Sequence, residues 1–112
     1  MSKRSDHLHQ ADPALIFAAL GDGTRLALVA RLSDGQARSI AKLSGDTRLS
    51  RQAITKHLHV LENAGLVSST RAGRESQYAL EAKTIADASA YLDRVSQQWD
   101  DALSRLRAFV EG

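Results

Sequence analysis

The 112-residue chain contains no cysteine and only one proline, and aromatic residues make up just 4% of it. Without cysteine it forms no disulfide, no thiolate metal site and no thiol redox sensor. The scarcity of proline leaves long stretches free to form helix, and the length suits one domain. The first residues, MSKRSDHLHQAD, lack the apolar run of a signal peptide, and no segment is long enough to span a membrane. We therefore expect a cytoplasmic, mainly helical protein with no membrane partner.

Charge is distributed unevenly along the chain. The formal net charge is only +2, which alone does not indicate a nucleic-acid partner. From Arg38 to Arg74, however, seven basic residues stand against two acidic ones, Asp46 and Glu62, whereas the segment after Glu81 is slightly acidic. This asymmetry suits a middle segment that faces phosphate and a C-terminal segment that faces another partner.

The stretch from Ser50 to Gly65, SRQAITKHLHVLENAG, has the pattern of a short amphipathic helix. Ser50 can cap it by accepting a hydrogen bond from a free N–H of the first turn, and Gly65 can adopt the positive φ that ends a helix. At about 100° per residue, three apolar side chains form a narrow stripe that we expect to face the core. The stripe consists of Ile54, Leu58 and Leu61.

The opposite face of this helix carries no acidic residue. Its side chains are of types that hydrogen-bond to base edges and phosphates, because glutamine pairs with adenine, threonine with several bases, and lysine with guanine or phosphate. Any amphipathic helix has a polar face in water, so the rest of the chain has to decide whether this face binds DNA. It consists of Gln52, Thr55, Lys56 and His59.

The chain before Ser50 predicts a polar arm and three helices. Residues 1–11 are polar, and we expect a mobile arm in front of a single domain at 12–112. Asp12 and Pro13 favour the start of the first helix, which glycines at 21 and 23 should end.

A second helix should run through Leu32, and a short third helix, IAKLSG, should follow Ser39. Two short helices joined by a tight turn, the later one with a polar outer face, form a helix-turn-helix. The residues of the second helix that we expect to face inward are Leu26, Val29 and Ala30.

Directly after Gly65 the pattern changes from helical to extended. Segments 66–71 and 74–80 predict a two-stranded hairpin with its turn at Ala72–Gly73. Arg71 and Arg74 flank this turn, which suits a wing that contacts a phosphate strand or the neighbouring minor groove. The alternative is an ordinary exposed hairpin whose arginines only add solubility, but its position after a helix-turn-helix favours a wing.

From about residue 82 to 110 the chain returns to helix, without proline or glycine. Apolar residues recur at alternating spacings of three and four, which is typical of a helix that pairs with another helix. A helix of this length overhangs so small a domain, so we expect a second copy of the chain to cover it; packing on its own domain alone is the alternative for its first turns. The expected dimer interface comprises Phe17, Leu92, Val95, Trp99, Leu103 and Leu106.

With these elements in this order, the chain resembles the ArsR/SmtB family of winged helix-turn-helix transcriptional repressors. The resemblance covers residue 12 to the C-terminus and is carried by IFAALGDGTRLALVARL, by LSRQAITKHLHVLENAGLV and by GRESQYAL. It implies a homodimer that binds double-stranded DNA at an inverted-repeat operator and leaves it when a signal arrives. The segment from Ser50 to Leu61 would enter the major groove. The contacts that the family implies correspond to Arg51, Gln52, Thr55, Lys56 and His59, with Arg71 and Arg74 in the wing.

The family's metal sites are missing from this sequence. The third helix reads SIAKLSG, without the cysteine pair of metal-sensing members, and the last helix contains no histidine. The chain therefore resembles the metal-free branch, and we expect no cofactor and no metal site, beyond incidental zinc at His7 and His9. His57 lies at the edge of the inner stripe, where a structural hydrogen bond is expected. A small-molecule or protein inducer is left unidentified.

The sequence offers little support for two other classes of function. An enzyme would need a nucleophile, a paired acid and base or a phosphate-binding loop, and the sequence offers none of these constellations. The stronger alternative is a winged-helix module that uses the same face for protein contacts and does not bind DNA. The local basic excess favours DNA.

Overall fold

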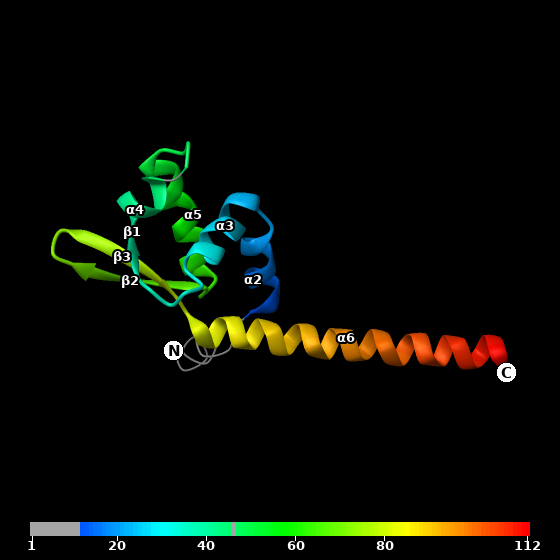
Figure 1. Ribbon diagram of the computed structural model, residues 1–112. Coiled ribbons are helices and arrows are strands. Elements are labelled where there is room, and N and C mark those ends of the chain that lie inside the picture. The colour runs from blue at the N-terminus through cyan, green and yellow to red at the C-terminus, as the bar shows by residue number, and fades with distance from the viewer. Residues whose placement is uncertain (1–11, 46) are drawn as a thin grey trace.

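A computed structural model describes residues 12–45 and 47–112 of the chain. Over these residues, helices and a small sheet form one body from which a long helix extends (Figure 1). The predicted winged helix-turn-helix is confirmed, whereas the arm expected at 1–11 lies outside the described residues. The elements are α2 (Pro13–Leu20), α3 (Gly23–Arg31), β1 (Arg38–Ser39), α4 (Ile40–Gly45), α5 (Arg51–Asn63), β2 (Val67–Ala72), β3 (Glu75–Leu80) and α6 (Ala82–Glu111).

Aspartate caps begin the first two helices. Asp12 Oδ1 accepts hydrogen bonds from the main-chain N–H groups of Ala14 at 3.0 Å and Leu15 at 3.4 Å, and Pro13 occupies the first helical position, as predicted. Asp22 Oδ2 accepts in the same way from the N–H of Arg25 at 3.0 Å, so the second helix begins at Gly23. These caps satisfy N–H groups that have no partner within their helices.

The inward face of α3 differs from the prediction. Leu28 is buried and Leu26, expected to face inward, is 52% exposed. Two residues along a helix correspond to a rotation of about 200°, so burial of Leu28 turns Leu26 to the opposite side. Ala30 is also exposed, and Val29 packs at the margin of the core.

The hydrophobic core lies where α2, α3, α4 and α5 meet the sheet. The first turns of α6 close it from below through Ala88, which is buried, and Ile85, which packs against the same cluster. All three residues of the predicted α5 stripe are fully buried in this core. Its buried members are Ile16, Ala19, Leu28, Leu32, Leu43, Ile54, Leu58, Leu61, Ala64, Leu66, Val67, Tyr78 and Ala88.

The sheet has three antiparallel strands in the order β1-β3-β2, one more than predicted. The missed strand is only two residues long, and Arg38 and Ser39 pair with Tyr78 and Gln77 of β3. Ser39 also caps α4, because its Oγ accepts the N–H of Lys42 at 3.2 Å. Ser39, the residue expected to begin the third helix, is therefore both the last residue of β1 and the cap of α4.

The wing consists of β2 and β3, which pair from Val67–Leu80 out to Ala72–Glu75. The turn between them is Gly73–Arg74, one residue later than predicted, so Arg74 lies in the turn itself and not at the start of a strand. Gly73 has φ +65°, and a glycine with positive φ at the first central position is what a two-residue type II′ hairpin turn requires.

The last helix, α6, continues for 30 residues, and most of it projects beyond the body of the protein (Figure 1). The Cα radius of gyration is 18.1 Å, against about 13 Å for a compact chain of this length. Within the described ranges no single helix is long and apolar enough to cross a membrane; α2 and α3 pass that test only as a pair, bent by 99°. Because α6 runs from Ala82 to Glu111, it contains the whole of the helix predicted at 82–110.

One ion pair fixes the loop that leads from α3 into β1. Arg38 Nη2 lies 2.6 Å from Asp34 Oδ2, and Arg38 Nη1 donates to the carbonyl of Arg31 at 2.7 Å. The hydrogen bonds from the Arg38 side chain, with one from the N–H of Gln36, lower the pKa of Asp34 from 3.8 to about 2.

Asp34→Asn should therefore lower the melting temperature at neutral pH. Since the pKa of Asp34 is lower in the folded protein than in the unfolded chain, its stabilising effect is present above about pH 4 and is lost as the pH falls through 2. Thermal unfolding followed by circular dichroism at several pH values should show the gap between variant and wild type narrowing below pH 4. Asp87→Asn is the control, because its ion pair with Lys83 is more exposed, at 71% for the lysine, and should matter little at any pH. A gap that stays constant with pH would contradict this assignment.

Candidate nucleic-acid interface

Both ends of α5 are fixed as the sequence predicts. Ser50 is the N-cap, and its Oγ accepts the N–H of Ala53 at 3.1 Å. At the other end Gly65 has φ +79°. The N–H of Leu66 donates to the main-chain carbonyl of Leu61 at 2.9 Å, and the N–H of Gly65 donates to the main-chain carbonyl of Glu62 at 2.9 Å. This pair of bonds is a Schellman motif, which ends the helix and turns the chain into the wing.

The outer face of α5 is exposed along most of its length. Four of the predicted contact residues on this helix lie open to solvent, and the fifth, Thr55, is half-buried. The Thr55 hydroxyl donates to the carbonyl of Arg51 at 2.7 Å, so Thr55 keeps only its methyl group and an acceptor oxygen for a ligand. The four exposed residues are Arg51, Gln52, Lys56 and His59.

The wing carries two of the predicted contact residues, Arg71 and Arg74. Arg71 shares a sheet face with Ser69 and Tyr78, because directly opposed residues of paired strands project to the same side. That face is turned toward α5, since Ser69 Oγ donates to Glu62 Oε2 at 2.8 Å and Tyr78 is buried in the core. Arg71 is exposed farther out on it, and Arg74 is exposed in the turn.

A polar cluster joins the inner edge of α5 to the corner between α2 and α3. Arg25 Nη1 lies 3.2 Å from His57 Nδ1, and Arg25 Nε donates to the carbonyl of Ala19 at 2.6 Å. Asp22 Oδ2 is 3.9 Å from His57 Nδ1. The hydrogen bond from the N–H of Arg25 and the nearby positive charge of its side chain lower the pKa of Asp22. The structural hydrogen bond expected for His57 is present, but its partner, Arg25, was not foreseen.

Sequence reasoning also left Arg48 out of the predicted contacts. It is exposed in the turn of the helix-turn-helix, two residues before the cap of α5. The turn is held by Thr47, whose N–H donates to the carbonyl of Ser44 at 3.1 Å and whose Oγ1 accepts the N–H of Leu49 at 3.1 Å. The signal that could have found Arg48 is its membership of the basic excess between residues 38 and 74.

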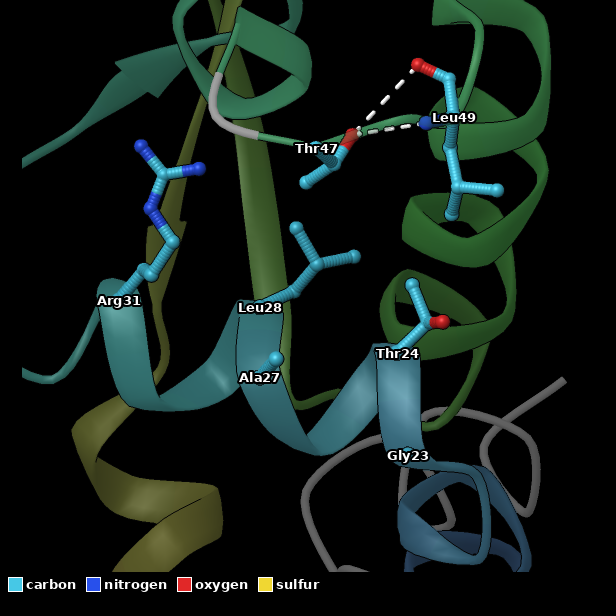
Figure 2. A pocket seen from close by; sticks show the side chains of 7 residues that line it. All are labelled: Gly23, Thr24, Ala27, Leu28, Arg31, Thr47 and Leu49. Carbon is cyan, nitrogen blue, oxygen red and sulfur yellow. Dashed lines mark hydrogen bonds between the residues drawn. The ribbon is translucent and has the colours of Figure 1, made fainter.

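A pocket of about 280 Å³ lies between α3 and this turn (Figure 2). Its size falls just below the roughly 300–1,000 Å³ of typical ligand sites. Two of its polar side chains already have partners, since Arg31 Nη1 donates to the carbonyl of Leu43 at 2.7 Å and Thr47 Oγ1 accepts the N–H of Leu49. The pocket therefore does not identify an inducer. It is lined by Gly23, Thr24, Ala27, Leu28, Arg31, Thr47 and Leu49.

The described part of the chain contains no group of three or more histidine, aspartate or glutamate side chains placed to hold a metal ion. His7 and His9, the pair considered for incidental zinc, lie outside the described residues.

The residues expected at a dimer interface fall into two groups. Phe17 packs inside its own chain, where its ring centroid lies 5.9 Å from that of Tyr91 of α6, and Val95 is half-buried. The others are exposed on the projecting part of α6, including Trp99, which is 65% exposed. The exposed members are Leu92, Trp99, Leu103 and Leu106, and Phe109 and Val110 extend the same apolar surface.

Comparison with known proteins places this geometry among DNA-binding regulators. Residues 20–70 match the model of a family described as a helix-turn-helix domain. The chain is 38% identical over 99 residues to the HTH-type transcriptional regulator Rv2034 of Mycobacterium tuberculosis, covering 88% of this chain and 89% of that protein. An ArsR-like transcriptional regulator from Rhodococcus sp. RHA1 superposes with a TM-score of 0.75 at 35% identity, over 87% of this chain and 91% of that one.

A further solved structure is the homodimeric winged helix-turn-helix DNA-binding domain of Mb0332 from Mycobacterium bovis, described as a possible ArsR-family regulator. It superposes with a TM-score of 0.61 at 25% identity, over 76% of this chain and 78% of that chain.

Ser50→Ala should destabilise the folded protein by roughly 0.5–2 kcal/mol, because the N–H of Ala53 loses its acceptor at the start of α5. The change can be measured as the free energy of unfolding in urea. Ser50→Asn, which keeps a side-chain acceptor at the cap, should stay within a few tenths of a kcal/mol of wild type. Equal loss in both variants would mean that the hydroxyl does not act as the cap.

Proposed function

The chain belongs to the ArsR/SmtB family of winged helix-turn-helix transcriptional regulators, and on this basis we propose that it is a homodimeric repressor that binds an inverted-repeat operator. In this proposal α5 enters the major groove of double-stranded DNA and the wing contacts flanking phosphates.

The observation that carries the proposal is the outer face of α5. It is exposed and free of acidic side chains, while the opposite face is fully buried and holds the helix in one orientation. Gln52 offers an amide that can pair with adenine, and Arg51 and Lys56 can reach guanine or phosphate. Ser50, Thr55 and His59 complete the set of proposed contacts on this helix.

Contacts outside α5 would position the protein on the duplex. Arg71 and Arg74 of the wing, together with Arg48 of the turn, are exposed cations on the segments that follow and precede α5. Contacts from such side chains to phosphate fix orientation without reading sequence. The proposal therefore separates base-reading residues on α5 from phosphate-contacting residues on either side of it.

The dimer is supported by the apolar surface of α6. Each large apolar side chain gains roughly 1.5–3 kcal/mol when it moves from water to full burial, and several are exposed side by side on the projecting part of the helix. Mb0332, with a similar fold, is a homodimer. A symmetric pair would place two α5 helices on one side of the duplex, about one helical turn or a small multiple apart.

The alternative is a winged-helix module that contacts protein through the same face and leaves DNA unbound. The two differ in their response to salt, because a protein that neutralises phosphates loses affinity linearly with the logarithm of salt concentration. The acid-free face and the flanking arginines favour DNA. The proposal includes no enzymatic activity, no metal and no cofactor, a cytoplasmic location, and release by an inducer whose chemistry is left open.

Gln52→Ala should weaken operator binding by roughly 1–3 kcal/mol and relax the base preference at one position of each half-site, whereas Arg74→Ala should weaken binding to all sequences alike and reduce the salt dependence. The operator would first be obtained by selecting bound genomic fragments at physiological salt. Titrations against this operator and against scrambled duplex then separate the two effects. Gln36→Ala, the same change in the exposed loop before β1, is the control. Unchanged operator affinity in Gln52→Ala would show that the assigned face is wrong.

Trp99→Asp should convert the dimer into monomers and abolish operator binding, because it places a charge in the centre of the apolar surface of α6. Sedimentation velocity measures the first effect and operator titration the second. Ser104→Asp is the matched control, because its position on α6 is about 140° from that of Trp99 and it adds the same charge. A dimer that persists in Trp99→Asp would rule out this interface.

A further inference from the structure

Thr55 is the proposed contact on α5 whose hydroxyl proton is already in use. Its Oγ1 donates to the main-chain carbonyl of Arg51 at 2.7 Å, one turn earlier in the same helix. A hydroxyl carries a single hydrogen, so this bond leaves the side chain with a methyl group and oxygen lone pairs for a ligand. The four exposed contacts on the same helix, by contrast, all carry N–H donors. They are Arg51, Gln52, Lys56 and His59.

The bond to Arg51 also fixes where the methyl group of Thr55 lies. A threonine side chain turns about one torsion, χ1, which branching at Cβ already restricts, and a hydroxyl held on a carbonyl selects one rotamer. The Cγ2 methyl group is therefore held in one position, on a side chain that is half-buried. A side chain that is ordered before binding loses little conformational entropy when a ligand contacts it. The methyl group is thus a preorganised apolar contact.

Thr55 lies at the margin of the outer face of α5, on the side of the wing. At about 100° per residue it is roughly 60° around the helix from Gln52 and about 40° from His59. Glu62, seven residues later and so on nearly the same side of the helix, accepts a hydrogen bond from Ser69 of β2 at 2.8 Å. When α5 lies in a major groove, Thr55 is therefore placed beside the residues proposed to read base edges.

The base edges of the major groove offer one apolar group, the C5 methyl group of thymine. Guanine and the N7 atom of adenine offer acceptors, and Thr55 has no proton for them unless its bond to Arg51 breaks. Two methyl groups that come into contact both leave water, which favours binding without any hydrogen bond. The chemistry left at Thr55 therefore matches thymine.

We propose that Thr55 is a specificity-determining residue that selects a thymine in each half-site, through contact between its Cγ2 methyl group and the C5 methyl group of the base. The inference rests on the proposed function, because it requires α5 in the major groove. The competing assignment is that Oγ1 of Thr55 accepts a hydrogen bond from the amino group of adenine or cytosine. The two assignments predict opposite behaviour of Thr55→Ser and Thr55→Val.

The test removes one methyl group at a time from each partner. In the operator selected from genomic fragments, deoxyuridine replaces the thymines of one half-site singly; it lacks the C5 methyl group and pairs in the same way. Thr55→Ser removes the protein methyl group and keeps the hydroxyl, whereas Thr55→Val keeps a methyl group and removes the hydroxyl. Affinities are measured at constant salt.

In wild type, replacing one particular thymine should weaken binding about fourfold, the factor expected for one methyl group removed from water. Thr55→Ser should bind the thymine and deoxyuridine operators at that position equally, and Thr55→Val should retain the fourfold ratio. A ratio of two affinities for the same protein does not change with that protein's stability, so this readout separates base contact from a structural role. Thr84→Ser, the same deletion at a half-buried threonine of α6, is the control and should keep both the wild-type affinity and the ratio.

Equal sensitivity of wild type and Thr55→Ser to deoxyuridine at every position would overturn the inference. A ratio that disappears in Thr55→Val and persists in Thr55→Ser would also overturn it, because the hydroxyl would then be the group that reads the base. In both cases operator binding persists and the proposed function of α5 stands. If wild type does not prefer the operator to scrambled duplex, the proposed function fails, and the inference fails with it.

Discussion

The structure depends on one constraint: a helix of 13 residues has to be buried along one side and left bare along the other. A helix of this length is marginally stable alone in water, so α5 owes its existence to the packing of Ile54, Leu58 and Leu61 in the core. The remaining elements supply that packing surface, with α2 and α3 on one side and α4 and the sheet on the other. Because the inner face is fixed by burial, the outer face needs no contact of its own to keep its orientation.

The described arginines that precede α6 divide into two groups according to what their guanidinium groups contact. Arg25, Arg31 and Arg38 donate to the main-chain carbonyls of Ala19, Leu43 and Arg31, so each guanidinium ties its own segment to another. A guanidinium suits this task because its five N–H donors can serve several acceptors at once. The exposed arginines of this part of the chain lie in the turn before α5, at the first position of α5 and in the wing. The basic excess of the central segment therefore overstates the charge offered to a ligand, since Arg38 is paired with Asp34. The exposed members are Arg48, Arg51, Arg71 and Arg74.

Sequence patterns predicted those features that depend on local chemistry. The caps at Asp12 and Ser50, the positive φ of Gly65 and the extent of α6 follow from short-range rules, and all are present. The long-range features were missed. Strand β1 has only two residues, too few for an alternation of apolar and polar side chains to be recognised. It forms because Arg38 and Ser39 pair with the free edge of β3.

Two further misses have the same origin in tertiary contacts. The choice of Leu28 over Leu26 depends on the direction from which α3 meets the core, and the bond between Arg25 and His57 joins residues 32 positions apart. For the site, exposure of the α5 face and of both wing arginines agrees with expectation, while contact with DNA stays a prediction. Helix α6 was predicted in full because its apolar residues recur at helical spacing over many turns, which identifies the helix whatever it packs against.

A single residue, Glu81, separates the last residue of the wing from the first residue of α6. Its main-chain N–H donates to the carbonyl of Leu66 at 2.9 Å, so the junction is fixed to the start of the other wing strand as well. Because this joint is one residue long and is held by a hydrogen bond, we expect α6 and the wing to move together as one unit. In the proposed dimer, a small rotation of one α6 helix against the other would displace the wing tips by a larger distance. The crossing angle of the two α6 helices would therefore set the length of DNA that both protomers can contact at once.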